Sequence, residues 1–283
     1  MPRRIAFINE KGGSGKTTLV ANLAYFLAHE EGLRTLAIDM DPQGQLGKVL
    51  GLDVHSPRRS AVDLLLDSFL RDGDAPAALD EPTDRLPVMK TRVPNLDVIV
   101  SNKSLALFPA WAGNDLPEDP SALLQERLDR ASELREYDVV LFDAPPSFGP
   151  LTLNVLRACT DVVIPVPLTY LALDGCAELV KTLELVRRRY RHPDLAIRMV
   201  VPTFYRRTRM AKEILEALRD RFPREISKTV IGFTVKIDEA QSRGLTIFET
   251  APRHSGARTL SALGDELLER LRSPVPPPAS PPE

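Results

Sequence analysis

The chain has 283 residues, of which 43% are hydrophobic and 27% are charged, and its formal net charge is −2. This balance is typical of a globular protein with one large α/β domain or two small ones, and it excludes a polycationic or disordered chain. Two cysteines and four histidines exclude a disulfide framework and make a structural metal cluster unexpected. We see no secretory signal segment and no apolar run of 18 residues, so we expect a cytoplasmic protein.

Short apolar runs predict strands that are buried on both faces of a sheet. They lie at residues 3–9, 34–40, 96–101, 137–143, 161–167 and 195–201. Helical patterns fit between them, at about residues 16–30, 61–70, 121–136, 150–159, 171–191 and 206–221. This alternation predicts an α/β fold with a single doubly wound, mostly parallel sheet and helices on both faces. Ligands of such sheets bind at the carboxyl ends of the strands.

Two segments lack a regular pattern. Residues 72–95 are rich in Asp, Pro and Ala, and we expect a loop-rich connection there. The tail SPVPPPASPPE (273–283) is rich in proline and short of apolar residues, so we expect it to be disordered, with a docking peptide as the alternative. The predicted folded domain therefore spans residues 1–272.

The segment INEKGGSGKTTL, which begins at Ile8, joins the first predicted strand to the first predicted helix. It follows the phosphate-binding pattern G-x-x-x-x-G-K-[ST], except that Glu10 stands at the first glycine position and a second lysine, Lys11, precedes the glycines. Glycines let backbone N–H groups approach phosphates, and the following helix N-terminus favours anions. The expected nucleotide-binding residues are Gly12, Gly13, Ser14, Gly15, Lys16, Thr17 and Thr18.

The side chains of this loop have distinct expected roles. Lys16 should reach the β- and γ-phosphates, Thr17 should place its hydroxyl on Mg²⁺, and Thr18 should contact the α-phosphate. A tight turn without a ligand is the alternative, but the loop coincides with a preceding strand, a following helix and two acidic strand ends further along the chain.

The first acidic strand end is IDMDPQG (38–44), which closes the second predicted strand. Because side chains alternate along a strand, we expect Asp39 and Asp41 to point the same way, one to hold Mg²⁺ through water and one to orient an attacking water. The second is VVLFDAPPS (139–147), in which Asp143 ends the fourth predicted strand and should join the Mg²⁺ shell. The alternatives are aspartates that only cap turns or end strands.

Together these segments resemble the deviant Walker A ATPases of the ParA/MinD family, and within it the ParA/Soj partition proteins. The resemblance covers about residues 3–265. It is carried by KGGSGKTT (11–18), DMDPQG (39–44), VVLFDAPPS (139–147) and KTVIGFTVKIDEAQSRG (228–244). It implies a slow, Mg²⁺-dependent ATP hydrolase that works as a switch and forms a homodimer on ATP.

The resemblance also implies how the second lysine acts. Lys11 would cross the dimer interface and contact the partner's ATP, while Lys16 serves its own nucleotide. Two ATP molecules face to face concentrate negative charge, which a lysine donated from the partner offsets. Asp41 would orient the hydrolytic water and Asp39 would support Mg²⁺, so the expected catalytic residues are Lys11, Lys16 and Asp41. The alternative for Lys11 is a solvated loop charge.

One part of the family pattern differs here. Partition relatives usually carry Pro, Arg, Asn and Arg where this chain has Gly232, Phe233, Thr234 and Lys236. The proline and asparagine help to hold the adenine, and Gly232 and Thr234 stand in their places. Gly232 and Thr234 are therefore the expected adenine contacts.

Positive charge is concentrated between residues 187 and 224, which hold 12 lysines and arginines but 4 aspartates and glutamates. Its clusters are RRRYRH (187–192) and YRRTR (205–209). By resemblance, this region of the ATP dimer binds double-stranded DNA without sequence preference, whereas a solvated basic helix face is the alternative. Each phosphate contact makes such binding more sensitive to salt. The expected DNA-binding residues are Arg206, Arg207, Arg209 and Lys236.

The resemblance implies a nucleoid-associated protein that partitions chromosome or plasmid DNA and whose hydrolysis is stimulated by a ParB-like partner. A protein cargo positioned on the nucleoid is a first alternative. A MinD-like membrane switch is a second, although residues 257–272 read as a core-packing helix and we expect no stable membrane association. A metabolic enzyme on the same fold is a third. Cys159 and Cys176 fit burial better than an iron–sulfur cluster.

Overall fold

The computed structural model describes residues 1–283 apart from 55–58, 67–84, 115–118, 171 and 274–283. Nearly all of the predicted disordered tail and most of the predicted connection at 72–95 lie outside the described residues. The predictions for these segments, and the domain boundary at residue 272, therefore stay predictions.

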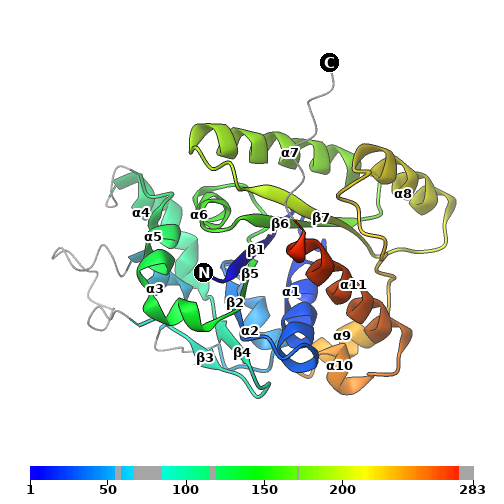
Figure 1. The fold of residues 1–283 in the computed structure, drawn as a ribbon, viewed down its shortest axis with the longest axis horizontal. Coiled ribbons are helices and arrows are strands. Elements are labelled where there is room, and N and C mark those ends of the chain that lie inside the picture. Colours follow the sequence, from blue (N-terminus) through cyan, green and yellow to red (C-terminus); the bar gives the residue numbers. More distant parts are fainter. Residues whose placement is uncertain (55–58, 67–84, 115–118, 171, 274–283) are drawn as a thin grey trace.

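A seven-stranded sheet with the order β3-β4-β2-β5-β1-β6-β7 forms the centre of the molecule (Figure 1). The strands are β1 (Arg3–Phe7), β2 (Thr35–Asp39), β3 (Met89–Lys90), β4 (Leu96–Ile99), β5 (Val139–Asp143), β6 (Asp161–Pro167) and β7 (Ala196–Thr203). The six predicted strands are confirmed, and their pairings are parallel. Strand β3 was not predicted; it pairs antiparallel with β4 at the edge of the sheet.

Helices cover both faces of the sheet, as predicted (Figure 1). They are α1 (Lys16–Tyr25), η1 (Phe26–Glu30), α2 (Gln45–Val49), α3 (Ala61–Leu66), η3 (Lys103–Leu107), α4 (Phe108–Asn114), α5 (Leu123–Arg130), η4 (Ser132–Glu136), α6 (Pro150–Ala158), α7 (Ala172–Arg189), α8 (Arg209–Arg221), α9 (Val235–Gln241), α10 (Ile247–Thr250) and α11 (Ser255–Arg272).

Two predicted helices have different bounds in the structure. The helix expected at 206–221 begins at Arg209, because the Thr208 hydroxyl accepts a hydrogen bond from the Ala211 N–H at 3.2 Å and caps it. The helix expected at 121–136 is split into α5 and η4, since Ala131 takes an extended conformation with ψ 107°.

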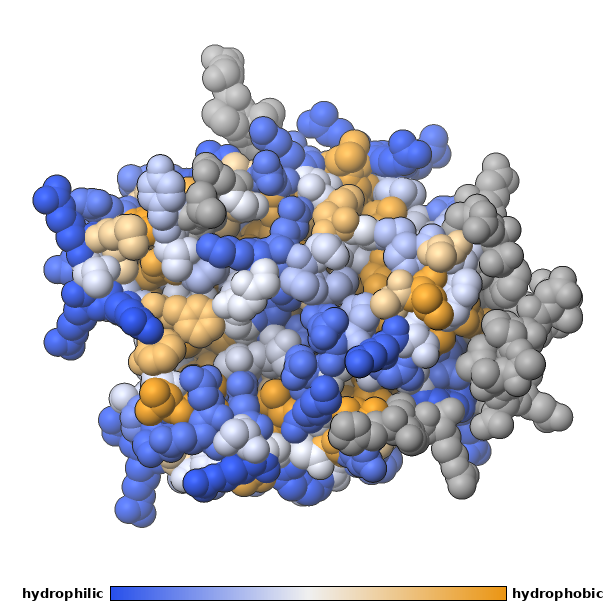
Figure 2. All heavy atoms as spheres, turned by 180° about the vertical axis from the view of Figure 1, so that it is seen from behind, coloured by the Kyte–Doolittle hydropathy of each residue, from blue (hydrophilic) through white to orange (hydrophobic). Residues whose placement is uncertain are grey.

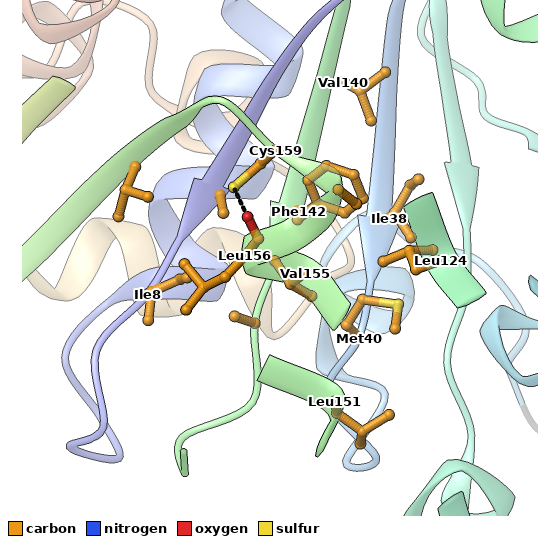
Figure 3. Packing of buried hydrophobic residues seen from close by; sticks show 14 of the residues in the cluster. Ile8, Ile38, Met40, Leu124, Val140, Phe142, Leu151, Val155, Leu156 and Cys159 are labelled. Carbon is orange, nitrogen blue, oxygen red and sulfur yellow. Dashed lines mark hydrogen bonds between the residues drawn. The ribbon is translucent and has the colours of Figure 1, made fainter. Parts of the chain in front are cut away.

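Strand side chains alternate between two apolar cores, one on each face of the sheet. Ile5 and Phe7 belong to the core beneath α1 and α11, whereas Ile8 belongs to the core beneath α3 to α8. Figure 3 shows Ile8 and Phe142 close to Leu156 of α6 within this second core. Burial on both faces explains why the strands read as continuous apolar runs.

Helix α11 packs its apolar side chains into the protein. Leu260, Leu263, Leu267 and Leu271 are all buried in the core beneath α1 and α11. The predicted core-packing role of this helix is therefore confirmed. Within the described part of the chain, no helix is long and apolar enough to cross a membrane.

The carboxyl ends of β1, β2 and β5 lie at one edge of the sheet. In the parallel register, Asp143 pairs with Phe7 on one side and with Asp39 on the other. The loops that follow these three strands therefore leave the sheet together. This is the edge at which the sequence predicted the chemistry.

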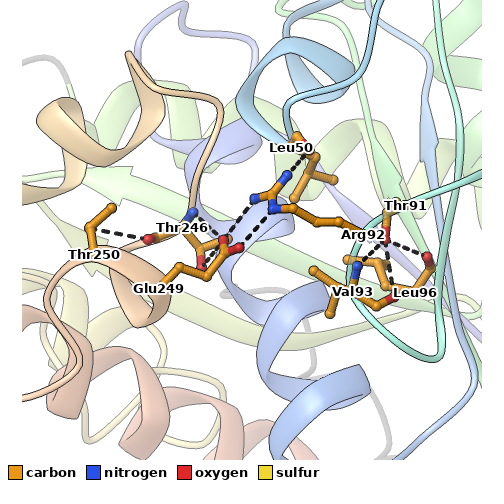
Figure 4. A network of polar contacts seen from close by, with 8 residues as sticks. All are labelled: Leu50, Thr91, Arg92, Val93, Leu96, Thr246, Glu249 and Thr250. Carbon is orange, nitrogen blue, oxygen red and sulfur yellow. Dashed lines mark hydrogen bonds and ion pairs between the residues drawn. The ribbon is translucent and has the colours of Figure 1, made fainter.

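A polar network ties the β3–β4 edge to the C-terminal helices (Figure 4). The Arg92 guanidinium donates to both Glu249 carboxylate oxygens at 2.8 Å and to the Leu50 carbonyl oxygen. Glu249 also accepts from the backbone N–H of Thr246 at 2.8 Å, which caps α10. The Arg92 guanidinium thus joins its own loop to the ends of α2 and α10.

Next to this network two glycines let backbones touch. A Cβ on Gly244, which follows α9, would lie 2.6 Å from the Gly51 Cα, which follows α2. Both residues have positive φ, 67° and 72°, so any side chain there would be strained as well as blocked. The ends of α2 and α9 are therefore in direct backbone contact.

We expect Arg92→Ala to lower the free energy of unfolding by about 1–3 kcal/mol, because it leaves the half-buried Glu249 carboxylate without its bidentate donor. Urea unfolding measures the change. Arg130→Ala is the matched control: Arg130 pairs with Glu126 at 3.3 Å with both side chains at least half exposed, and its loss should cost less than about 0.5 kcal/mol. Equal effects of the two substitutions would contradict a structural role for the network.

Candidate nucleotide-binding site

The loop between β1 and α1 is held open by Asn9. Its side-chain amide donates to the Pro165 carbonyl oxygen at 2.7 Å, and its Oδ1 accepts from the Lys11 N–H at 2.8 Å. Gly13 and Gly15 have left-handed φ values of 70° and 94°, which favour glycine. This conformation fits a loop whose backbone N–H groups face an anion at the start of α1.

Lys16 lies at the base of this loop. It is buried, and its Nζ donates to the Asn9 carbonyl oxygen at 3.1 Å. Burial lowers the pKa of Lys16, while the Asp143 and Asp41 carboxylates favour its charged form and oppose the shift. A cation held at this depth is suited to phosphates bound by the loop.

Thr17 and Asp143 meet as the sequence predicted. The Thr17 hydroxyl donates to Asp143 Oδ2 at 2.6 Å, whereas the buried Oδ1 has no hydrogen-bond partner among the described residues. Burial raises the pKa of Asp143 to about 7, against the opposing effects of the Thr17 hydrogen bond and the Lys16 charge. A buried carboxylate oxygen without a donor, beside a hydroxyl, suits a hard cation such as Mg²⁺.

The two aspartates of segment 38–44 differ in burial. Strand β2 ends at Asp39 and Asp41 lies beyond it, so strand alternation does not determine the direction of Asp41, and the predicted common direction stays a prediction. Asp39 is fully buried, and its oxygens accept from the N–H groups of Asp41 and Leu46 at 3.0 Å each. Burial and the neighbouring Asp143 raise the pKa of Asp39 well above its usual range. Asp39 thereby shapes the turn, and its role toward Mg²⁺ stays a prediction.

Asp41 lies at the rim of the site. It is half-buried, and its Oδ1 accepts from the Gln43 N–H at 2.9 Å. Its charge acts on Lys16 and on Asp143, which places it within electrostatic reach of both. A carboxylate in this position can orient a water molecule in front of the loop.

Lys11 and Lys16 lie in different environments. Lys11 is exposed, and its Nζ donates to the Thr169 hydroxyl after β6 at 3.0 Å. It therefore reaches outward across the mouth of the site, while Lys16 points to its base. The two lysines are thus separated in the structure, and the contact of Lys11 with a partner's nucleotide stays a prediction.

A pocket begins beside Gly15 and Thr18 and extends to α9. Its walls contain Gly232 and Thr234, the predicted adenine contacts. Among the lining residues that sequence reasoning did not assign to the nucleotide are Phe204, Phe233 and Asp238. A further unpredicted contact is made by Gln241, whose amide donates to the Thr18 hydroxyl at 3.0 Å. Only the departures from the family pattern at 232–236 pointed to this region.

The predicted DNA-binding residues lie on two adjacent segments. A parallel bridge joins Tyr205 to Gly232, so the arginines after Tyr205 lie beside the segment that carries Lys236. The Arg206 guanidinium lies 4.4 Å from the centroid of the Phe233 ring. All four residues are exposed, and two of them form ion pairs at 2.7 Å, Arg209 with Glu213 and Lys236 with Glu239.

We expect Asp143→Asn to stabilise the protein at pH 8, measured without nucleotide or Mg²⁺. The folded-state pKa of Asp143 is raised above its unfolded value of 3.8, so this group favours folding at low pH and opposes it as the pH rises through about 7. Urea unfolding should show a gain of more than about 1 kcal/mol at pH 8 that shrinks at pH 5. Asp220→Asn, on the exposed face of α8, should change neither value. A variant destabilised at both pH values would contradict this account.

Comparison with known proteins places this site in a family. A protein-family model for an AAA domain matches residues 2–197. The chain is 37% identical to the chromosome-partitioning ATPase Soj of Thermus thermophilus over 95% of this chain and 97% of the relative. It is 34% identical to the cell division protein PomZ of Myxococcus xanthus over 95% of this chain and 79% of the relative.

Among solved structures, cobyrinic acid a,c-diamide synthase of Mycobacterium smegmatis with bound ADP and magnesium has a TM-score of 0.76 and 29% identity, over 96% of each chain. The sequence likeness to the named partition ATPases extends over nearly the whole chain and includes the loop, the DPQG turn and the strand that ends at Asp143. The chain belongs to the ParA/Soj family of P-loop ATPases.

Proposed function

We propose that this protein is an ATP- and Mg²⁺-dependent switch that dimerises on ATP, binds double-stranded DNA and partitions or positions chromosome or plasmid DNA. The observation that carries the proposal is the pair of lysines in one phosphate loop. Lys16 is buried at the base of the loop and Lys11 is exposed at its mouth. A single bound nucleotide needs the first lysine, whereas the second is free to reach a nucleotide on another chain.

The triphosphate would lie on the loop, with the backbone N–H groups of residues 12–18 as donors and Lys16 at the β- and γ-phosphates. The Thr17 hydroxyl and Asp143 would hold Mg²⁺, and the unpartnered Asp143 Oδ1 supports this role. Bound Mg²⁺ neutralises charge on the phosphates. Asp41 would orient the attacking water from the rim.

In the dimer, Lys11 would leave Thr169 and contact the ATP of the partner chain. Its single hydrogen bond to the neutral Thr169 hydroxyl is exposed, so exchanging it for an ion pair with a phosphate is favourable. Two exposed apolar side chains, Phe148 and Tyr170, follow β5 and β6, whose carboxyl ends lie at the same edge. They would be covered when a second chain docks there.

DNA would contact the cations at 206–209 and Lys236, which the bridge between Tyr205 and Gly232 holds side by side. Phosphate contacts of this kind carry little sequence information, so binding would be non-specific and would place the protein on the nucleoid. A dimer presents two such surfaces to one DNA duplex, so its DNA affinity exceeds that of a monomer. Because the dimer forms on ATP, DNA binding would depend steeply on ATP. A ParB-like activator on the cargo would then end the bound state by stimulating hydrolysis.

Three alternatives predict other properties. A MinD-like membrane switch needs an exposed apolar helix, but α11 buries Leu260, Leu263, Leu267 and Leu271. On the face of the molecule that is turned away in Figure 1, apolar side chains lie in small patches among hydrophilic ones (Figure 2). A metabolic enzyme such as a diamide synthase, as the Mycobacterium smegmatis neighbour is named, does not account for an exposed second loop lysine. A protein cargo would leave the ATP and DNA steps unchanged.

An iron–sulfur enzyme on this fold is disfavoured by the cysteines. Cys159 and Cys176 are both buried and free, and burial raises the pKa of Cys176 to about 11. Within the described residues, no group of three or more His, Cys, Asp or Glu side chains could hold a metal ion. The predicted role of both thiols as small apolar side chains is supported.

Lys11→Ala should bind ATP as a monomer with an unchanged affinity but fail to dimerise, because Lys11 does not reach the base of its own loop. Calorimetry gives the affinity, and light scattering with the slowly hydrolysing Asp41→Ala background gives the mass. Lys16→Ala is the contrasting variant and should lose ATP binding altogether. An ATP dimer that survives in Lys11→Ala would refute the proposed contact with the partner.

The proposed function is tested by binding to a non-specific DNA duplex without nucleotide, with ADP and with ATP, using Asp41→Ala to prevent turnover. We expect salt-sensitive binding with ATP alone. Arg207→Ala should weaken it and reduce the slope of log K against log salt by roughly 0.9 for each DNA phosphate that the variant no longer neutralises. Arg130→Ala, an exposed arginine on α5, is the control. Absence of DNA binding in every nucleotide state would remove the partition function.

A further inference from the structure

We propose that Phe233 and Asp238 recognise the purine base of the bound nucleotide, with Phe233 as the stacking surface and Asp238 as the acceptor for the adenine amine. The inference rests on the proposed function, because it requires ATP on the loop at 10–18. It assigns base recognition to Phe233 and Asp238 in place of Gly232 and Thr234.

The pocket beside the loop is placed for a base. Its near wall is formed by Gly15 and Thr18 at the start of α1, where the phosphates would be held, and its far wall is formed by α9. Phe204 closes one side: a Cβ on Gly15 would lie 3.5 Å from the Phe204 ring. Phe204 has a φ of 54°, a left-handed conformation that an aromatic residue adopts at a cost.

The two residues predicted from the family pattern offer few side-chain contacts to a base. Gly232 has no side chain, and the hydrogen bonds of its bridge to Tyr205 are made by the Ile231 carbonyl and the Phe233 N–H on either side of it. The Thr234 hydroxyl accepts from the Lys236 N–H at 3.3 Å as the cap of α9. The Thr234 methyl faces Gly256, where a Cβ would lie 3.2 Å from it. Base recognition by side chains therefore has to come from their neighbours.

Phe233 provides an exposed aromatic surface. The side chain is 46% exposed, and it lines the pocket. Arg206 lies 4.4 Å from the ring centroid but does not line the pocket. This cation–π contact helps to fix the orientation of an aromatic ring that could stack on a base.

Asp238 provides an unpaired acceptor at the same pocket. It lies in the first turn of α9, is exposed and lines the pocket. Within the described part of the chain its carboxylate forms no hydrogen bond and no ion pair, whereas the adjacent Glu239 is paired with Lys236 at 2.7 Å. An ionised carboxylate only accepts hydrogen bonds. It therefore pairs with the amine at position 6 of adenine and repels the carbonyl oxygen that hypoxanthine and guanine carry there.

The test compares the affinities for ATP and inosine triphosphate, measured by calorimetry with Mg²⁺ at one salt concentration. We expect the wild-type protein to prefer ATP by about tenfold or more, the effect of one hydrogen bond to a charged group. Asp238→Asn should lower this preference at least about tenfold, because the amide can donate to the inosine carbonyl. Glu239→Gln, on the same helix but outside the pocket, should leave the preference unchanged.

Phe233→Leu separates stacking from hydrogen bonding. It should weaken both nucleotides by about tenfold and keep their ratio, while binding of tripolyphosphate, which has no base, stays the same. An unchanged ATP preference in Asp238→Asn, with ATP binding intact, would overturn this inference alone. Failure of the wild-type protein to bind ATP would overturn the proposed function, and the inference with it.

Discussion

Two carboxylates buried side by side set the electrostatics of the whole sheet edge. Asp39 and Asp143 are register partners on adjacent strands, and almost no part of either side chain reaches solvent. Burying two negative charges is costly unless donors or a cation compensate. Backbone N–H groups of the turn after β2 hold Asp39, while Thr17 and Lys16 act on Asp143. The charges of Asp39 and Asp143 therefore connect the sheet edge to the phosphate loop and to the expected Mg²⁺ site.

The phosphate loop is also held by the second half of the chain. The Thr203 hydroxyl at the end of β7 donates to the Ser14 carbonyl oxygen at 3.0 Å, and Gln241 at the end of α9 donates to the Thr18 hydroxyl at 3.0 Å. The basic segment at 205–209 directly follows the first of these contacts. Nucleotide chemistry and the basic surface thus share the same supporting residues, although they lie about 200 residues apart in the sequence.

Local sequence patterns were sufficient for the sheet and for the loop. Buried parallel strands are continuous apolar runs, and the glycine-lysine-threonine segment needs no partner to be recognised. The missed features depend on contacts between distant residues. Strand β3 has two residues and exists through its pairing with β4, and Phe233 and Asp238 become part of a pocket only when α9 packs beside α1. The end of β2 likewise depends on the bonds from the Asp41 and Leu46 N–H groups to Asp39, which a local pattern does not reveal.

The glycine contact between the ends of α2 and α9 has a mechanical consequence. Helix α2 follows the turn that contains Asp41, and α9 carries Lys236. Because the backbones at Gly51 and Gly244 touch with no side chain between them, no rotamer change can absorb a displacement of one against the other. The two helix ends behave as a rigid joint, so a displacement of the segment at Gly51 is passed to the segment at Gly244 as a movement of the main chain.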